Sequence, residues 1–272
     1  MADNYLEKKF EEHLNAPYKP VRPKRSPTAS RRVVVTGGAK GIGSHIVRSL
    51  RVAAHKVAFC DIDEVAGRET ALRTGSDFYH VDVADAGAYM AFLRDVAEKW
   101  GGLDVIVNNV ALKRKADILD FTPELFDSTM ATDVRPVLIG AQQMACLRKG
   151  HDGAPVPSFG RIVNICSSCS RQSAPGNDVH SAAKGAISSL THSLALSLAP
   201  YGITVNSISP GKIYEPDIDP SPSATLPPSG RVGRPEDVAR VVRFIIEDGS
   251  DFINAENIVV DGGMTRKIIP NQ

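Results

Sequence analysis

The feature that most constrains the fold is a regular alternation of short apolar runs with segments of helical character, beginning at Arg32. The first run, Val33–Val35, is continuously apolar, as expected for a strand buried on both faces of a parallel sheet. Similar runs lie at residues 57–61, 78–83, 103–109, 162–165, 203–208 and 257–261. Such alternation predicts an α/β fold, in which a doubly wound parallel sheet carries helices on both faces.

Helices are expected in the intervening segments, at residues 44–50, 87–100, 124–147, 179–198 and 235–247. Pro136 lies inside the third of these, and a bend is expected there because proline has no backbone N–H to donate. Pro235 stands in the first turn of the last helix, where proline is well tolerated. No change in composition divides residues 32–272, so we expect a single domain there.

Two segments stand apart from this pattern. Residues 1–31 form an N-terminal arm: Tyr5–Leu14 has the spacing of a short amphipathic helix, and a linker rich in proline and basic residues follows it. We expect this arm either to be solvated or to pack on a neighbouring subunit. Residues 214–230 are rich in proline and are interpreted as an ordered lid that selects the substrate.

The composition excludes several classes of protein. With 272 residues and a net charge of +1, the chain has no strong electrostatic attraction to nucleic acid or to a membrane surface. It has no apolar run of membrane-spanning length and no secretory signal. The four cysteines do not make a disulfide framework, so we expect a cytoplasmic protein. Cys166 and Cys169 are interpreted as packing residues, and no metal site is predicted.

A glycine-rich turn after the first strand predicts a nucleotide site. Its spacing is Gly-x-x-x-Gly-x-Gly, with Gly37, Gly41 and Gly43 as the glycines and Lys40 and Ile42 between them. Glycines let the backbone approach a pyrophosphate, and the helix that follows directs its free N–H groups at the same anion. The turn lies between a predicted strand and a predicted helix, which makes the dinucleotide interpretation specific.

The choice between the two nicotinamide cofactors depends on Asp61 and Lys40. Asp61 ends the second predicted strand, where a carboxylate can accept hydrogen bonds from a ribose diol and repel a 2′-phosphate. Lys40 is a cation inside the glycine turn and can instead meet that phosphate. The sequence therefore favours NAD and leaves NADP open.

A second chemical centre is predicted between Arg161 and Lys184. Ser167 follows the fifth predicted strand, and the next helix carries His180 and Lys184. Residues four apart share one face of a helix, so the imidazole and the ammonium point in the same direction. A hydroxyl, an imidazole and an ammonium that converge on one place are a plausible catalytic arrangement.

From Arg32 to Arg266 these motifs resemble the short-chain dehydrogenase/reductase family. The matching segments are Thr36–Gly43, Asp82-Val83, Asn108-Asn109, Gly160–Ile165, Ala182–Ala186, Pro210–Ile213 and Val259–Met264. The resemblance implies a Rossmann-type sheet of about seven strands, a bound nicotinamide cofactor, a small-molecule substrate and a homotetramer or homodimer. It also implies further cofactor contacts at Asp82, Val83, Asn109, Lys184 and Ile213.

The same resemblance exposes four departures from the family pattern, the first being that Asn108-Asn109 continues as Val110-Ala111 where the family usually continues Ala-Gly. The position that holds the catalytic tyrosine in the family is His180, although Ser167 and Lys184 stand where the family has its serine and lysine. The asparagine of the family's proton relay is replaced by Asp133. The threonine that often follows the Pro-Gly-x-Ile turn is missing, because Tyr214 comes next.

These departures admit three hypotheses about function. In the favoured one, the protein reduces an iminium cation, which needs no proton donor, and Asp133 and Glu215 stabilise the cation. In this hypothesis the protein is similar to fungal indole-alkaloid enzymes of this fold, which reduce an iminium and guide a Diels–Alder cyclisation. Arg135 is then the candidate for holding a substrate amide carbonyl.

The alternatives use the same residues differently. In an ordinary carbonyl/alcohol oxidoreductase, His180 is the general acid, and Asp133 offsets the charge of Lys184 and orients the imidazole. Lys184 should push that imidazole toward its neutral form. In the remaining alternative, the protein binds a nucleotide without catalysis.

Overall fold

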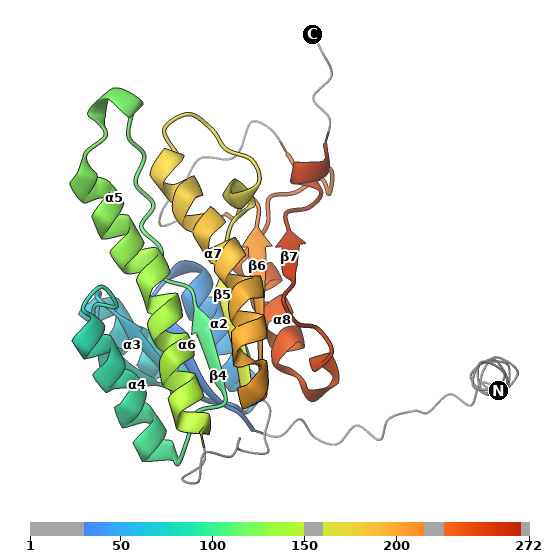
Figure 1. The fold of residues 1–272 in the computed structure, drawn as a ribbon. Coiled ribbons are helices and arrows are strands. Elements are labelled where there is room, and N and C mark those ends of the chain that lie inside the picture. Colours follow the sequence, from blue (N-terminus) through green and yellow to red (C-terminus); the bar gives the residue numbers. More distant parts are fainter. Residues whose placement is uncertain (1–29, 150–159, 215–225, 268–272) are drawn as a thin grey trace, which may run out of the picture.

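A computed structural model describes residues 30–149, 160–214 and 226–267. The described chain forms a parallel sheet of seven strands in the order β3-β2-β1-β4-β5-β6-β7 (Figure 1). The strands are β1 (Arg32–Thr36), β2 (Lys56–Asp61), β3 (Asp77–His80), β4 (Val105–Asn108), β5 (Gly160–Ile165), β6 (Ile203–Pro210) and β7 (Asn257–Val260). The order runs outward from β1 to β3 and then resumes on the other side of β1 with β4. That reversal puts the topological switch point of the sheet at the carboxyl ends of β1 and β4, which is where doubly wound sheets bind their ligands.

Helices cover both faces of the sheet, as predicted. They are α2 (Gly41–Val52), α3 (Glu64–Thr74), α4 (Ala86–Trp100), α5 (Pro123–Thr129), α6 (Arg135–Arg148), α7 (Asp178–Leu198) and α8 (Pro235–Ile246). In Figure 1, α4, α6 and α7 lie in front of the sheet, and α2 and α8 lie behind it.

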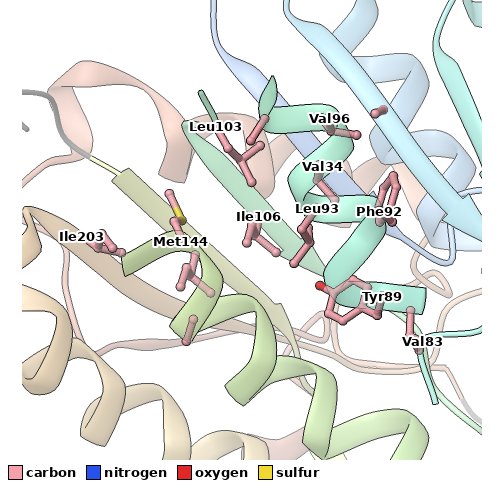
Figure 2. Close-up of a cluster of buried hydrophobic side chains, with 14 of the residues drawn as sticks. Val34, Val83, Tyr89, Phe92, Leu93, Val96, Leu103, Ile106, Met144 and Ile203 are labelled. Carbon is pink, nitrogen blue, oxygen red and sulfur yellow. The ribbon is translucent and has the colours of Figure 1, made fainter. Parts of the chain in front are cut away.

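The two faces of β1 explain this layering. Val34 packs in a buried cluster with residues of α4, α6 and α7, whereas Val33 and Val35 pack in a second cluster with residues of α2 and α8. Successive side chains of a strand point to opposite faces, so a continuously apolar strand needs a helical layer on each side. Figure 2 shows the first cluster, in which Leu93 of α4 lies beside Ile106 of β4.

Local signals at the helix ends follow simple rules. Asp85 caps α4 by accepting a hydrogen bond from the N–H of Ala88, and Gly101 ends that helix in the left-handed conformation, with φ of 70°. At the amino-terminal ends of the strands, Arg32 and Asp104 form an ion pair of 2.7 Å. This ion pair joins the beginnings of β1 and β4.

The structure corrects three sequence-based expectations about elements. The third strand ends at His80, so residues 81–83 lie in the connection that follows it. The helix α3 was not predicted, because few of its apolar side chains follow helical spacing and Val65 and Leu72 are exposed. The expected helix 124–147 is three elements, since a π-helical turn at Met130–Val134 separates α5 from α6.

Pro136 is the second residue of α6 and follows the π-helical turn directly. The regular α-helical pattern is thus interrupted next to the residue that has no backbone N–H to donate. The expected N-terminal helix and most of the expected lid lie outside the described residues. Within the described part of the chain, no helix is both long enough and apolar enough to cross a membrane.

Candidate active site

The glycine turn adopts a conformation that only glycine permits at its key positions. Gly37 and Gly41 have φ of +67° and +52°, in the left-handed region. A Cβ atom on Gly43 would lie 1.9 Å from the carbonyl oxygen of Gly37, so α2 can start this close to the turn only without a side chain there. No side chain caps the first turn of α2 at Lys40. The helix N-terminus is thus available to an anion, as the phosphate interpretation requires.

Asn109 braces this turn from the end of β4. Its side-chain amide donates to the carbonyl oxygens of Thr36 and Gly37 at 3.1 and 3.0 Å. Its backbone N–H donates to the hydroxyl of Thr36 at 2.9 Å. The structure therefore places Asn109 beside the turn in a supporting role, and a direct contact with the cofactor stays a prediction.

The acidic end of β2 lies against the same turn. The carboxylate of Asp61 accepts hydrogen bonds from the backbone N–H groups of Ala39 at 3.0 Å and Asp63 at 3.1 Å. Lys40 reaches over this group and pairs with the carboxylate of Asp63 at 2.6 Å. The hydrogen bond from Lys40 lowers the pKa of Asp63. The predicted ribose site thus carries two carboxylates and one ammonium.

The connection after β3 is also where the resemblance placed it. Val83 is buried in the core, and the carboxylate of Asp82 accepts a hydrogen bond from the N–H of Ala84 at 2.8 Å. Arg135 donates to the carbonyl oxygen of Ala84 at 2.5 Å. This contact ties Arg135 to the connection between β3 and α4. Its expected contact with a substrate carbonyl stays a prediction.

The predicted catalytic residues gather at the ends of β5, the π-helical turn and α7. Lys184 is buried, and its ammonium donates to the carbonyl oxygen of Ile165 at 3.1 Å. Asp133 is also buried, and its Oδ2 lies 3.7 Å from the Nζ of Lys184. The other carboxylate oxygen of Asp133 accepts a hydrogen bond from the N–H of Leu112 at 2.8 Å.

Burial dominates the electrostatics of this pair. Loss of solvent raises the pKa of Asp133, while the charge of Lys184 and the N–H of Leu112 act against that rise. Loss of solvent likewise lowers the pKa of Lys184, and the charge of Asp133 opposes the change. Each group therefore supports the charged form of the other in a place that disfavours both charges.

His180 lies one helical turn before Lys184 and is half-buried. Burial lowers the pKa of its imidazole, the charge of Lys184 lowers it further, and a backbone hydrogen bond with Leu112 acts in the opposite direction. Burial and the charge of Lys184 therefore both favour the neutral form of the imidazole over its charged form. Its Nδ1 is buried without a hydrogen-bond partner in the described part of the chain.

The Asp133–His180 pair expected from the sequence is therefore wrong as a hydrogen bond. Asp133 does offset the charge of Lys184, as expected, but its oxygens face Leu112 and Lys184 rather than the imidazole. Nothing in the sequence indicates the part played by Leu112 and by the carbonyl oxygen of Ile165. Both contacts involve main-chain atoms, and no residue type signals such a contact.

Ser167 follows β5 directly, with an extended backbone. Its hydroxyl oxygen accepts a hydrogen bond from the N–H of Cys169 at 3.1 Å, which begins a short 3-10 turn. Cys166 is buried and its thiol donates to the carbonyl oxygen of Lys184 at 3.1 Å, in agreement with a packing role. The cysteines are free thiols, and the described residues contain no group of ligands suited to a metal ion.

Ile213 lies just after β6 and packs against the second core cluster. It pairs with Gly233 in an isolated β-bridge, and the N–H of Tyr214 donates to the carbonyl oxygen of Gly233 at 2.8 Å. These contacts attach the first residue of the predicted lid, residues 214–230, to Gly233. Glu215, the second carboxylate of the iminium hypothesis, lies outside the described residues.

The fold and the candidate site together define a class of protein, the dinucleotide-dependent oxidoreductases. The features of this class are the glycine turn after β1, the carboxylate at the end of β2, and the group formed by Ser167, His180 and Lys184. Residues 37–265 match the sequence profile described as enoyl-(acyl carrier protein) reductase. The chain belongs to the short-chain dehydrogenase/reductase family.

Relatives of known sequence agree with this class. The chain is 37% identical to an uncharacterized oxidoreductase of Thermotoga maritima, over 87% of this chain and 96% of that one. It is 32% identical to a cyclopentanol dehydrogenase of Comamonas, over 86% of this chain and 96% of that one. It is 34% identical to an acetoacetyl-CoA reductase of Shinella zoogloeoides, over 86% of this chain and 98% of that one.

Solved structures show the same fold. A variant of a Serratia marcescens short-chain dehydrogenase/reductase superposes with a TM-score of 0.79 at 26% identity, covering 88% of this chain and 99% of that one. An apo SCOR enzyme from Clostridium thermocellum superposes with a TM-score of 0.76 at 34% identity, covering 88% of this chain and 94% of that one.

Proposed function

We propose that this protein is an NAD-dependent oxidoreductase that interconverts a secondary alcohol and its ketone, with His180 as the acid–base residue. The observation that carries the proposal is the position of His180 on α7, one helical turn before the buried Lys184 and next in line after Ser167 at the end of β5. Burial and the charge of Lys184 lower the pKa of His180, which favours the neutral imidazole that can accept the proton of an alcohol. Bound NAD would accept the hydride in the oxidation direction.

The neighbouring groups support this role. The hydroxyl oxygen of Ser167 only accepts in the described contacts, so its own O–H is available to donate to the substrate oxygen. The charge of Lys184 opposes protonation of His180 and so keeps the base in its active form before reaction. After proton transfer, the same charge favours passing the proton on to solvent.

The named relatives support the reaction class rather than a particular substrate. Two of these relatives, cyclopentanol dehydrogenase and acetoacetyl-CoA reductase, are named for reactions of a secondary alcohol or of a ketone. The acidic end of β2, with Asp61 fixed by two backbone N–H groups, supports NAD as the cofactor.

The test is an assay of NADH formation with cyclic secondary alcohols, polyols and 3-hydroxyacyl thioesters. We expect at least one class to reduce NAD stoichiometrically in the wild type, and His180→Phe to lose this reaction while it retains NAD binding. His192→Phe is a matched control, because His192 is an exposed histidine further along the same helix. A wild-type protein that binds NAD and turns over none of these alcohols would contradict the proposal.

Iminium reduction is a second candidate, and the observation that favours it is the histidine at position 180, where the family has its tyrosine. Burial and the charge of Lys184 lower the pKa of this imidazole. A neutral imidazole is a poor acid for ketone reduction, whereas hydride addition to C=N⁺ requires no proton. The contacts of Asp133 with Lys184 and Leu112 argue against Asp133 as the group that stabilises the substrate cation. Guided Diels–Alder cyclisation in an alkaloid pathway belongs to this candidate.

Matched cyclic iminium and ketone substrates separate the two candidates. Iminium reduction predicts faster NADH consumption with the iminium, and almost no effect of His180→Phe. Alcohol–ketone chemistry predicts faster turnover of the ketone and a large effect of that substitution. A protein that binds NADH and oxidises it with neither substrate would support the non-catalytic alternative.

We also propose that the protein forms a homodimer or homotetramer. Leu138 of α6 and Leu196 of α7 are 46% and 76% exposed, on helices that cover the same face of the sheet. Exposed large apolar side chains on neighbouring helices support a contact with a second copy. Light scattering of the full chain tests this, and a monomer at micromolar concentration would contradict it.

A further inference from the structure

Two carboxylates and one ammonium lie around the predicted ribose site. Asp61 and Asp63 supply two carboxylates, and Lys40 supplies the ammonium that lies between this end of β2 and the glycine turn. The Nζ of Lys40 is 2.6 Å from Oδ2 of Asp63. The side chains of Lys40 and Asp63 remain 61% and 37% exposed, so this ion pair faces solvent, where a ribose substituent would arrive.

We propose that Asp63 is a second determinant of cofactor choice, because it holds the ammonium of Lys40 away from the place of a 2′-phosphate. The proposal rests on the NAD-dependent function proposed above and assigns this chain's discrimination to two carboxylates rather than to Asp61 alone. Lys40 is the cation of the glycine turn and the natural partner of a 2′-phosphate. In this structure its ammonium is paired with a carboxylate of the protein instead.

The two carboxylates have distinct tasks. Both oxygens of Asp61 accept backbone hydrogen bonds, from Ala39 and Asp63, which hold this carboxylate at the end of β2. Asp63 uses one oxygen to cap α3 by accepting the N–H of Ala66 at 3.0 Å, and the other to bind Lys40. A 2′-phosphate arriving here would meet the fixed charge of Asp61 and would compete with Asp63 for Lys40.

The cap and the charge of Asp63 can be separated by substitution. Asparagine caps a helix about as well as aspartate does, so Asp63→Asn keeps the bond to Ala66 and removes the charge that holds Lys40. Glu64 offers a matched control, because it is an acidic residue in the same helical turn and pairs with Arg68 at 2.6 Å rather than with Lys40.

The test measures binding without catalysis, by calorimetry of the full chain with adenosine 2′,5′-bisphosphate and with 5′-AMP. We expect Asp63→Asn to raise the affinity for the 2′-phosphorylated probe about tenfold, because the ammonium of Lys40 is released from Asp63 and can pair with the dianionic phosphate. The affinity for 5′-AMP should change less than about twofold, which is within the effect of a solvent-exposed charge. Lys40→Ala added to Asp63→Asn should abolish the gain.

Each other outcome overturns the inference. An unchanged affinity of Asp63→Asn for the bisphosphate, a gain that survives Lys40→Ala, or an equal gain from Glu64→Gln would each show that Asp63 does not act through Lys40. If the wild type binds 5′-AMP and one of these results follows, the inference fails while the proposed function stands. If neither probe nor NAD binds the wild type, the proposed function fails with it.

Discussion

The ammonium of Lys184 lies 3.7 Å from a carboxylate oxygen of Asp133, and the two side chains are 3% and 0% exposed. This pair connects α7 to the π-helical turn before α6, one helical turn after the half-buried His180 on α7. Removing one member of a buried ion pair leaves a charge without compensation, and this is usually strongly destabilising. The pair thus links the stability of the domain to the electrostatics of its active site.

We predict that Asp133→Asn lowers the free energy of unfolding by about 3–5 kcal/mol at neutral pH, because Lys184 loses its carboxylate partner. The loss should shrink as the pH rises. The pKa of Lys184 is already below its ordinary value and falls further in the variant, so the unfolded chain binds more protons than the folded one. Stability then rises with pH until the ordinary lysine pKa of about 10.5 is reached. Urea unfolding at several pH values measures this.

The double variant Asp133→Asn/Lys184→Met is the control for that interpretation. It removes the uncompensated charge, so it should recover much of the lost stability. A double variant as unstable as Asp133→Asn, or a loss that does not depend on pH, would show that the shape of the site matters and the charge pair does not.

A second prediction concerns the pH dependence of alcohol oxidation. His180→Phe should lower kcat/KM by about 10²–10⁴-fold, the usual contribution of a general base. In the wild type, kcat/KM should fall as the pH drops through the pKa of His180, which burial and Lys184 place below the ordinary imidazole value. Steady-state rates across the acid range measure this. An acid limb centred above about pH 6.5 would assign the base to another group.

The glycine turn gives a third prediction. Gly43→Ala should abolish NAD binding, because the added Cβ atom would lie 1.9 Å from the carbonyl oxygen of Gly37 and 2.7 Å from the side-chain amide of Asn109. Gly185→Ala is the matched control, since a Cβ at this position in α7 has no atom within 4 Å. That control should bind NAD normally and be stabilised by about 0.5–1 kcal/mol. Fluorescence titration and thermal melts measure both effects, and normal NAD binding by Gly43→Ala would contradict the role of the turn.

The core gives a fourth prediction, at Tyr89. Its ring is fully buried in the cluster of Figure 2, and its hydroxyl has no hydrogen-bond partner in the described part of the chain. Tyr89→Phe removes a buried polar group without leaving a large cavity, so we expect unchanged or slightly higher stability, by up to about 1 kcal/mol. Phe92→Leu in the same cluster should destabilise by more than 1 kcal/mol. Urea unfolding measures both, and a loss above about 1 kcal/mol in Tyr89→Phe would reveal a hydrogen bond to a buried water.

Local patterns were sufficient to predict most elements of this fold. The continuous apolar run of Val33–Val35 predicted a strand buried on both faces, and the two clusters on either side of β1 confirm it. The π-helical turn before Arg135 could not be predicted, because α-helical and π-helical turns share the same residue preferences. The helix α3 was missed because its surface position imposes little apolar periodicity.

For the site, the amino-acid sequence by itself determined where glycine is obligatory and that His180 and Lys184 share a helix face, because both follow from spacing along the chain. Only the tertiary structure decided what those groups contact. The carboxylate of Asp133 turned toward Lys184 and Leu112, and Lys40 toward Asp63. Such contacts depend on how distant strand ends and loops meet, and on the cost of burying charge, which no local periodicity records.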